Sequence, residues 1–326
     1  MRAAFVTHAG GKIGGGHLYR CYALSQALEE RGAEVSWALN AESEGLAASL
    51  GLRRVNLFDN PFEVKNITAA VDADVVVVDS YEPGESFFRD ISTRHKLAAV
   101  SDFGGDVSEN YASALINYSV GASDGLYSSR PSCRYLLGPR YALLRRDFWN
   151  MRSSDGGYVL FVPGAADVAN AAETIIGWWR EDLPELIIAC GSLVSGEARN
   201  SLVREAGKSG NISVMPSPEN FAEIMAGARI VICTASVTAY EALALRKRLA
   251  VFTVADNQLG LGERLEGIGA ACNLGSWSGV TQNSIEAALA FEPDRDVLRN
   301  LVNPRGAVEC AGELIGIDGV APDEAR

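Results

Sequence analysis

The sequence predicts an α/β protein of two domains, each built on a parallel sheet. Short apolar runs alternate with segments of helical periodicity along most of the 326 residues, which is the pattern of βαβ units. The most apolar run, Val75 to Val78, is continuously β-branched, as is typical of strands buried on both faces of a parallel sheet. The alternation lapses once near the middle of the chain and then resumes, which at this length indicates two domains.

The first half predicts strands joined by helices. Apolar runs predict the strands, and recurrence of apolar residues every three or four positions predicts the helices. The expected strands cover 3–6, 34–39, 74–79, 97–100 and 114–117, with 55–57 as a short strand or a loop. The expected helices cover 18–31, 41–50, 61–71 and a segment from about 85 to 94.

Residues 121–155, rich in Gly, Ser, Pro and Arg, are expected to connect the two domains. The first domain is therefore predicted over 1–145 and the second over 156–326. The second domain is expected to hold strands at 158–162, 186–189, 212–215, 230–233 and 249–253, with helices between them and from about 284 to the end.

The composition and charge of the chain limit its possible partners and its location. Hydrophobic residues make up 48% and charged residues 21%, as in an ordinary globular protein. The net charge of −12 argues against nucleic acid or an anionic membrane as a partner. The chain starts on a predicted strand, and no apolar run approaches the roughly 20 residues of a membrane span. Six scattered cysteines read as reduced thiols. We expect a cytoplasmic protein without stable membrane insertion, with a monomer favoured.

The most informative segment runs from Thr7 to Cys21, between the first strand and the first helix. Ligands of open α/β sheets bind at the carboxyl ends of strands, where this loop lies. Glycines let the backbone approach a ligand, and a helix start offers free N–H groups and a positive dipole end to an anion. The loop carries five glycines and two histidines: Gly10, Gly11, Gly14, Gly15, Gly16, His8 and His17.

The spacing of these glycines excludes two common phosphate-binding loops. It matches neither G-x-G-x-x-G nor G-x-x-x-x-G-K-[ST], so NAD and ATP phosphate cradles are disfavoured. His17 falls in the first turn of the predicted helix, where it could act as a base or simply cap the helix. His8 is a possible second polar contact. The residues alone thus predict an anion site with a candidate base.

Polar residues follow several other predicted strands. Asp79 and Tyr81 come after the most apolar strand, and Asn117 ends another, so all are expected at the same sheet edge. Helix capping by the first two and turn formation by Asn117 are the alternatives. In the second half, Gly164 and the Asp256-Asn257-Gln258 run follow strands, while Thr238 and Glu241 lie on the helix after 230–233.

Two Rossmann-like halves facing across a cleft are the layout of the nucleotide-sugar enzymes called GT-B, although topology does not fix function. Specific motifs carry a closer resemblance. The chain resembles the nucleotide-sugar hydrolases of pseudaminic acid biosynthesis, which are similar in fold to the MurG glycosyltransferase, over roughly residues 2 to 275. The motifs are IGGGHLYRC at 13–21, VVVDSY at 76–81, LINYSVGA at 115–122, LLGPRYALLRRDF at 136–148, DVAN at 167–170, AYE at 239–241 and ADNQ at 255–258.

The resemblance implies a function and roles for individual residues. The family removes UDP from an activated 2,4-diacetamido-2,4,6-trideoxy sugar, and His17 would be the base that activates water for inverting attack on the anomeric carbon. Asp79 and Tyr81 would share the catalytic site, and Glu241 would take the ribose hydroxyls. The expected substrate-binding or nucleotide-binding residues are Gly14, Gly15, Gly16, Asn117, Gly164, Thr238, Glu241, Asp256, Asn257 and Gln258.

Two motifs depart from the family pattern. The family's G-G-S-D-P loop is here Gly164-Ala165-Ala166-Asp167-Val168, and its G-S-T-x-W-E turn is here Ser236-Val237-Thr238-Ala239-Tyr240-Glu241. A hydroxyl and a glycine are thereby lost where the diphosphate is expected to lie. UDP remains the favoured leaving group, with another nucleotide or an altered sugar as alternatives.

No cofactor and no metal are expected. Asp72-Ala73-Asp74 precedes a buried strand and is better placed to cap it, and three scattered histidines do not make a zinc site. Helix N-termini can stabilise a leaving diphosphate without a cation. The predicted function is a metal-independent inverting nucleotide-sugar hydrolase. An inverting GT-B glycosyltransferase and a nucleotide-sugar binding protein that has lost turnover are the alternatives.

Overall fold

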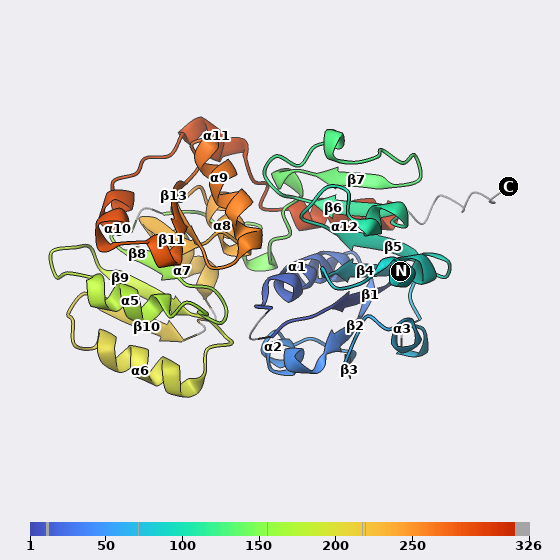
Figure 1. Ribbon diagram of the computed structural model, residues 1–326, viewed down its shortest axis with the longest axis horizontal. Helices are drawn as coiled ribbons and strands as arrows, with labels where there is room; N and C mark the ends of the chain where they lie inside the picture. Colours follow the sequence, from blue (N-terminus) through green and yellow to red (C-terminus); the bar gives the residue numbers. More distant parts are fainter. Residues whose placement is uncertain (11–12, 71, 155, 217, 219, 317–326) are drawn as a thin grey trace. The chain divides into compact units, whose positions relative to one another are not determined.

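The computed structural model describes residues 1–10, 13–70, 72–154, 156–216, 218 and 220–316 (Figure 1). Among these, the chain divides into two compact units. The first comprises 1–9, 17–146 and 305–316, and the second comprises 10, 13–16 and 147–304. No helix within the described ranges has both the length and the apolar character that crossing a bilayer requires.

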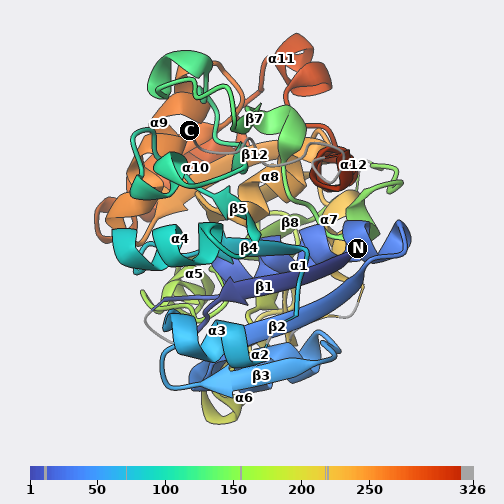
Figure 2. The same cartoon turned by 90° about the vertical axis from the view of Figure 1, so that its right-hand side faces the viewer.

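The first unit is organised around a seven-stranded sheet in which every pairing is parallel (Figure 2). The chain leaves β1 toward β2 on one side and returns to β4 on the other, so the carboxyl ends of β1 and β4 flank the switch point where ligands of such sheets bind. In spatial order the strands are β3 (Val55–Phe58), β2 (Glu34–Asn40), β1 (Arg2–Thr7), β4 (Val75–Asp79), β5 (Lys96–Val100), β6 (Ala114–Asn117) and β7 (Arg134–Leu137).

Helices and short 3₁₀ turns connect these strands. The longest, α1, begins directly after the glycine-rich loop, and its buried face includes Leu18, Cys21 and Leu24. The elements are α1 (Gly16–Glu30), η1 (Ala41–Ser43), α2 (Glu44–Ser49), α3 (Val64–Ala70), α4 (Glu85–Ser92), η2 (Val107–Asn110), η3 (Asp124–Leu126), η4 (Pro139–Tyr141), η5 (Arg146–Phe148) and α12 (Gly306–Gly316). Val71, the last residue of the expected third helix, lies outside the described residues.

The second unit repeats the topology with six parallel strands in the Rossmann order. Here β8 and β11 flank the switch point. The strands are, in spatial order, β10 (Ile212–Pro216), β9 (Leu186–Cys190), β8 (Val159–Val162), β11 (Ile230–Thr234), β12 (Arg248–Thr253) and β13 (Cys272–Ser276). The connecting elements are α5 (Ala171–Trp178), α6 (Gly196–Ala206), α7 (Phe221–Gly227), α8 (Val237–Ala244), η6 (Asp256–Gln258), α9 (Leu259–Gly267), η7 (Trp277–Gly279), α10 (Gln282–Leu289) and α11 (Arg295–Asn300).

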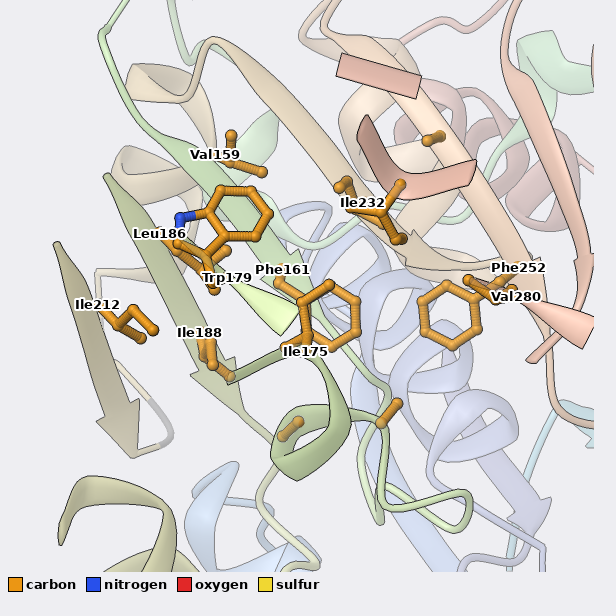
Figure 3. Close-up of a cluster of buried hydrophobic side chains, with 14 of the residues drawn as sticks. Val159, Phe161, Ile175, Trp179, Leu186, Ile188, Ile212, Ile232, Phe252 and Val280 are labelled. Carbon is orange, nitrogen blue, oxygen red and sulfur yellow. The ribbon is translucent and has the colours of Figure 1, made fainter. Parts of the chain in front are cut away.

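Each sheet is held by apolar side chains from its central strands. In the second unit, Phe161 of β8 and Phe252 of β12 stack (Figure 3), with ring centroids 5.6 Å apart. The Trp277 ring centroid lies 4.6 Å from that of Phe252. In the first unit, Phe5 stacks on Trp37 at 4.7 Å. The central strands β4 of the first unit and β8 of the second are buried along their whole length, which explains their continuous apolar sequences. The predicted class, two parallel α/β domains, is confirmed.

Two strands were missed by the sequence prediction. β7 lies inside the predicted connector, and β13 lies in a stretch without an assigned element. Each is at the end of its sheet, where a strand needs only one neighbour and can expose part of its surface. Leu136 is the single fully buried residue of β7, and β13 contains Gly275 at φ +74°, so neither shows the apolar run of a central strand.

The predicted domain limits are wrong at the C-terminal end. Helix α12 belongs to the first unit, where it packs on η4. Arg140 pairs with Glu309 at 3.1 Å, Arg31 donates to the Val308 carbonyl, and the Cys310 thiol faces the Tyr141 carbonyl at 3.6 Å. The segment from Pro139 to Tyr141 therefore anchors a distant helix.

Close approach at the start of α12 makes a prediction about stability. A Cβ on Gly306 would lie 2.6 Å from both the nitrogen and the oxygen of Ala142 and 2.7 Å from the Arg140 carbonyl oxygen. Backbone atoms cannot rotate aside, so Gly306→Ala should lower the free energy of unfolding by about 1–3 kcal/mol. Gly312→Ala is the matched control, because its Cβ would meet only the movable end of Arg31. Urea denaturation of both variants tests this; equal stability of the two would contradict it.

Candidate functional site

A histidine and a buried carboxylate form the centre of the site in the first unit. Asp79 is the last residue of β4, paired in register with Thr7 at the end of β1, and it is completely buried. The chain leaves β1 and enters α1, whose second residue, His17, returns over the end of β4. The Nδ1 atom of His17 lies 2.7 Å from Oδ1 of Asp79. Two residues 62 positions apart thus meet because β1, which leads into α1, lies beside β4 in the sheet.

Arg20 joins this pair to a second carboxylate. It lies one helical turn after His17, so the two side chains share a face of α1. Its Nη2 donates to Oδ1 of Asp79 at 2.6 Å, and its Nη1 lies 2.7 and 2.9 Å from the two oxygens of Asp102, which follows β5. Neither residue was predicted. The usable signals were the H-x-x-R spacing and the position of Asp102 after a strand.

These contacts fix the charge of Asp79. Burial alone would raise the pKa of its carboxyl, but the charge of Arg20 and the hydrogen bonds from Arg20 and His17 outweigh it and hold that pKa at about 2. Burial acts in the opposite sense on Arg20, yet Asp102 and Asp79 raise the pKa of its guanidinium well above the usual value. Asp79 is therefore an ionised carboxylate, and Arg20 its permanent counter-ion.

An ionised Asp79 determines the tautomer of His17. A carboxylate only accepts hydrogen bonds, so Nδ1 of His17 must carry the proton it donates to Oδ1. Arg20 Nη2 is also 3.1 Å from Nδ1, but a protonated nitrogen cannot accept its hydrogen. In the neutral ring, the lone pair is then on Nε2. His17 is oriented as a base whose free nitrogen points away from Asp79.

Two further rings pack against His17. Tyr81 meets it edge-on with centroids 4.8 Å apart, and its hydroxyl donates to Asp102. Burial, together with the negative charge of Asp102, raises the pKa of the Tyr81 hydroxyl, so it remains a neutral donor. The centroid of the His8 ring lies 5.2 Å from that of the His17 ring. The structure thus brings His17, Asp79 and Tyr81 together, as the sequence predicted.

The glycine-rich loop turns tightly before α1. Gly10 and Gly14 exchange two backbone hydrogen bonds, at 3.1 and 2.7 Å, and Gly14 adopts φ +79°, a conformation that disfavours residues with a Cβ. Gly15 is buried, and Gly16 begins α1. Gly11 and Lys12 lie outside the described residues.

The backbone before this loop is held by side chains that the sequence did not single out. The Ala9 N–H lies 3.0 Å from the amide oxygen of Asn40 and 2.9 Å from the Ser43 hydroxyl. The Asn40 amide in turn donates to the Ala9 carbonyl at 2.9 Å. The loop after β2 therefore fixes the point at which the glycine-rich loop leaves the sheet.

Asn117 is committed to local structure. It is buried at the end of β6, donates from Nδ2 to the Tyr127 hydroxyl at 2.7 Å and accepts from the Ser119 N–H at 2.9 Å. The second bond is the turn contact that was the alternative to ligand binding. Its geometry supports a role in shaping the loop after β6.

The second unit places the other predicted residues at the carboxyl edge of its own sheet. Gly164, after β8, has φ +97° and lies beside Thr234, the last residue of β11. Helix α8 follows, with Thr238 half-buried in its first turn and Glu241 one turn later. Glu241 is only 4% exposed, so it is not a solvated surface glutamate. The first N–H groups of α8 have no acceptor within their own helix.

The remaining predicted residues differ in exposure. Asp256 and Asn257 are exposed in η6, before α9, whereas Gln258 turns back to accept the Val254 N–H at 2.9 Å. Asp167 accepts from the N–H groups of Ala171 and Ala172 and so stabilises the start of α5. Asp256 and Asn257 are therefore free to face solvent, while Gln258 and Asp167 organise the backbone.

The buried charge cluster makes a prediction about stability. Asp79→Asn removes the negative charge that Arg20 faces, and breaking a buried ion pair typically lowers the free energy of unfolding by about 3–5 kcal/mol. Asp102→Asn is the control, because its side chain is 24% exposed and its loss should cost less. Because the pKa of Asp79 is depressed, its contribution is complete above pH ~4 and disappears as the pH falls toward ~2.

Urea denaturation at pH 7 and at about pH 3 measures both effects. The wild-type protein should lose more stability on acidification than the Asp79→Asn variant. A variant as stable as the wild type at pH 7 would contradict the charge assignment.

No protein-family model matches the chain. Among curated proteins, the uncharacterized protein MJ1062 of Methanocaldococcus jannaschii is 23% identical over 263 residues. The match covers 75% of this chain and 54% of that protein, so the chain spans about half the length of the curated relative it matches.

Solved structures give a fuller match. The calicheamicin glycosyltransferase CalG4 superposes with a TM-score of 0.65 at 15% identity, covering 98% of this chain and 99% of that one. Acinetobacter baumannii MurG gives 0.58 at 16% identity, covering 98% and 99%. The Methanocaldococcus jannaschii UDP-GlcNAc 2-epimerase, solved with UDP-GlcNAc and UDP, gives 0.58 at 13% identity, covering 97% and 100%. At these identities the likeness is one of fold, and the chain has the GT-B fold of the glycosyltransferases.

Proposed function

We propose that the protein is a metal-independent inverting hydrolase that releases a nucleoside diphosphate, UDP in the favoured case, from a nucleotide-activated amino or deoxy sugar. The observation that carries the proposal is the 2.7 Å contact between His17 and the ionised, fully buried Asp79. It leaves Nε2 of His17 as a free base at the ligand-binding edge of an α/β sheet. The motif resemblance to the nucleotide-sugar hydrolases of pseudaminic acid biosynthesis supplies the reaction.

In this mechanism the side chains of the first unit act on water and the sugar. Nε2 of His17 removes a proton from water as its oxygen attacks the anomeric carbon, and the carbon–oxygen bond to the diphosphate breaks with inversion. Asp79 stabilises the imidazolium that forms and keeps the ring oriented. Tyr81, packed on His17, offers the exposed face of its ring to the sugar.

The second unit is proposed to hold the nucleotide. Glu241 would accept the ribose hydroxyls, and the first turn of α8, including Thr238, would offer N–H groups to the diphosphate. Gly164 permits close approach of the backbone at the end of β8, and Asp256 and Asn257 reach solvent at the same sheet edge. The N–H groups at helix N-termini would stabilise the leaving diphosphate, so no metal cation is needed for that purpose. The epimerase of the same fold was solved with UDP-GlcNAc and UDP, which supports UDP as the ligand here.

A glycosyltransferase is the second candidate, because CalG4 and MurG are glycosyltransferases. The same His17–Asp79 pair could deprotonate an acceptor hydroxyl in place of water. The two activities differ in what the sugar is transferred to, so incubation with UDP-sugars in the presence and absence of acceptors separates them. The intact His17–Asp79 pair argues against a binding protein without turnover. The described cysteines are all free thiols, which fits the cytoplasm, where we place the reaction.

The first functional prediction concerns His17. His17→Asn retains a donor for Asp79 but has no basic nitrogen, so kcat should fall by about 10²–10⁴-fold. Nucleotide affinity, measured by titration calorimetry, should stay the same because the second unit is unchanged. His95→Asn is the matched control. His95 directly precedes β5, at the amino edge of the sheet, and its Nδ1 forms a hydrogen bond with the Ala73 carbonyl. Full activity of His17→Asn would show that another residue is the general base.

Turnover in ¹⁸O-labelled water with EDTA present tests the reaction itself. Attack at carbon places the label on the sugar, and mass spectrometry of both products would detect it. Label in the diphosphate would identify a phosphorus-attacking enzyme, and transfer to an acceptor without free sugar would identify a glycosyltransferase.

The second functional prediction concerns Glu241. A charge-assisted hydrogen bond contributes about 1.5–3 kcal/mol, so Glu241→Ala should weaken UDP binding by that amount. Glu185→Ala provides the control, because this exposed carboxylate precedes β9 at the opposite edge of the sheet. Calorimetric titration measures both variants, with thermal unfolding to verify that each is folded. An unchanged dissociation constant for a folded Glu241→Ala protein would remove the ribose assignment.

A further inference from the structure

His8 is a buried imidazole whose outer nitrogen has no partner. The residue follows β1 and is 4% exposed. Among the described residues, nothing forms a hydrogen bond with its Nε2. An unsatisfied buried polar atom destabilises a fold, so a native protein that keeps one commonly uses it for a ligand.

The surroundings of His8 make Nε2 an acceptor. Its Nδ1 lies 3.5 Å from the Glu82 carboxylate, which favours the tautomer with the proton on Nδ1. Phe62 packs edge-on against the ring at 5.3 Å. Burial and the neighbouring His17 both lower the pKa of His8, to about 4, so the ring is neutral at physiological pH. Nε2 then offers a lone pair and needs a donor.

The ring of His8 lies 5.2 Å from the ring of His17. Nε2 of His17 is also an acceptor, because its Nδ1 donates to Asp79. Two acceptor nitrogens on adjacent rings suit a molecule with two O–H bonds on one oxygen. Water has two, whereas the hydroxyl of an alcohol acceptor has one.

We propose that Nε2 of His8 and Nε2 of His17 together bind the attacking water, each accepting one of its hydrogens, and that His8 thereby selects water over an alcohol. This rests on the proposed hydrolase function. During attack, the water oxygen bonds to the anomeric carbon and the sugar–diphosphate bond breaks with its electron pair on the diphosphate oxygen. One proton passes to His17, and the other stays on the new sugar hydroxyl, bonded to His8.

The test compares His8→Phe, which keeps the ring shape without an acceptor, with His8→Gln, whose amide oxygen can replace Nε2. Each protein is incubated with the UDP-sugar that the wild type hydrolyses, in buffer with and without methanol, and free sugar and methyl glycoside are quantified. His8→Phe should lower kcat for hydrolysis by about tenfold, the effect of one hydrogen bond. It should raise the ratio of methanolysis to hydrolysis by a similar factor. His8→Gln should bring both kcat for hydrolysis and this ratio back toward the wild-type values.

Thermal unfolding separates this role from a structural one. His8→Phe should unfold at a temperature equal to or above that of the wild type, because a buried unsatisfied nitrogen is removed. The proposal would be overturned if a folded His8→Phe protein kept the wild-type kcat and the wild-type ratio of methyl glycoside to free sugar. It would also be overturned if the KM rose while kcat stayed unchanged, because His8 would then bind the sugar. If the wild type itself hydrolyses no UDP-sugar, it is the proposed function that fails.

Discussion

The carboxylate of Asp79 has no access to water, and it stays ionised because Arg20 donates to both of its oxygens while His17 donates to one. The rest of the candidate site depends on this arrangement. An ionised Asp79 sets the tautomer of His17 and leaves Nε2 as a base. Arg20 in turn positions Asp102, which receives the Tyr81 hydroxyl. A single buried charge therefore orders four side chains from one helix and the ends of two strands.

The doubly wound sheets explain why the candidate residues gather as they do. In each unit the strand order reverses beside the first strand, and the chain passes from that strand through a glycine-containing loop into a helix. In the first unit the feature at this edge is a base with its carboxylate. In the second it is a glycine, a helix start and a buried glutamate. The same topology thus carries two chemically different candidate sites. The proposed function assigns proton transfer to the first and nucleotide binding to the second.

Stability and the proposed chemistry make opposite demands at His8. A phenylalanine would fill the same space against Phe62 without leaving a polar atom unsatisfied. The histidine is held neutral by burial and by His17, so it cannot recover stability by becoming charged. Buried polar groups kept at such a cost are expected where a ligand completes their hydrogen bonds. The proposed water would do so for both histidines.

The sequence by itself determined the α/β class, the central strands of both sheets and the positions of His17, Asp79 and Tyr81 at a sheet edge. These follow from local signals: continuous apolar runs, and polar residues directly after them. Tertiary structure decided what local signals do not carry. Strands β7 and β13 form because a sheet offers them an edge, and α12 joins the first unit because Gly306 allows contact with η4. The roles of Arg20, Asp102 and Asn40 likewise depend on partners more than 30 positions away. Charge and hydrogen bonding act through space, so only the folded chain shows which carboxylate His17 and Arg20 share.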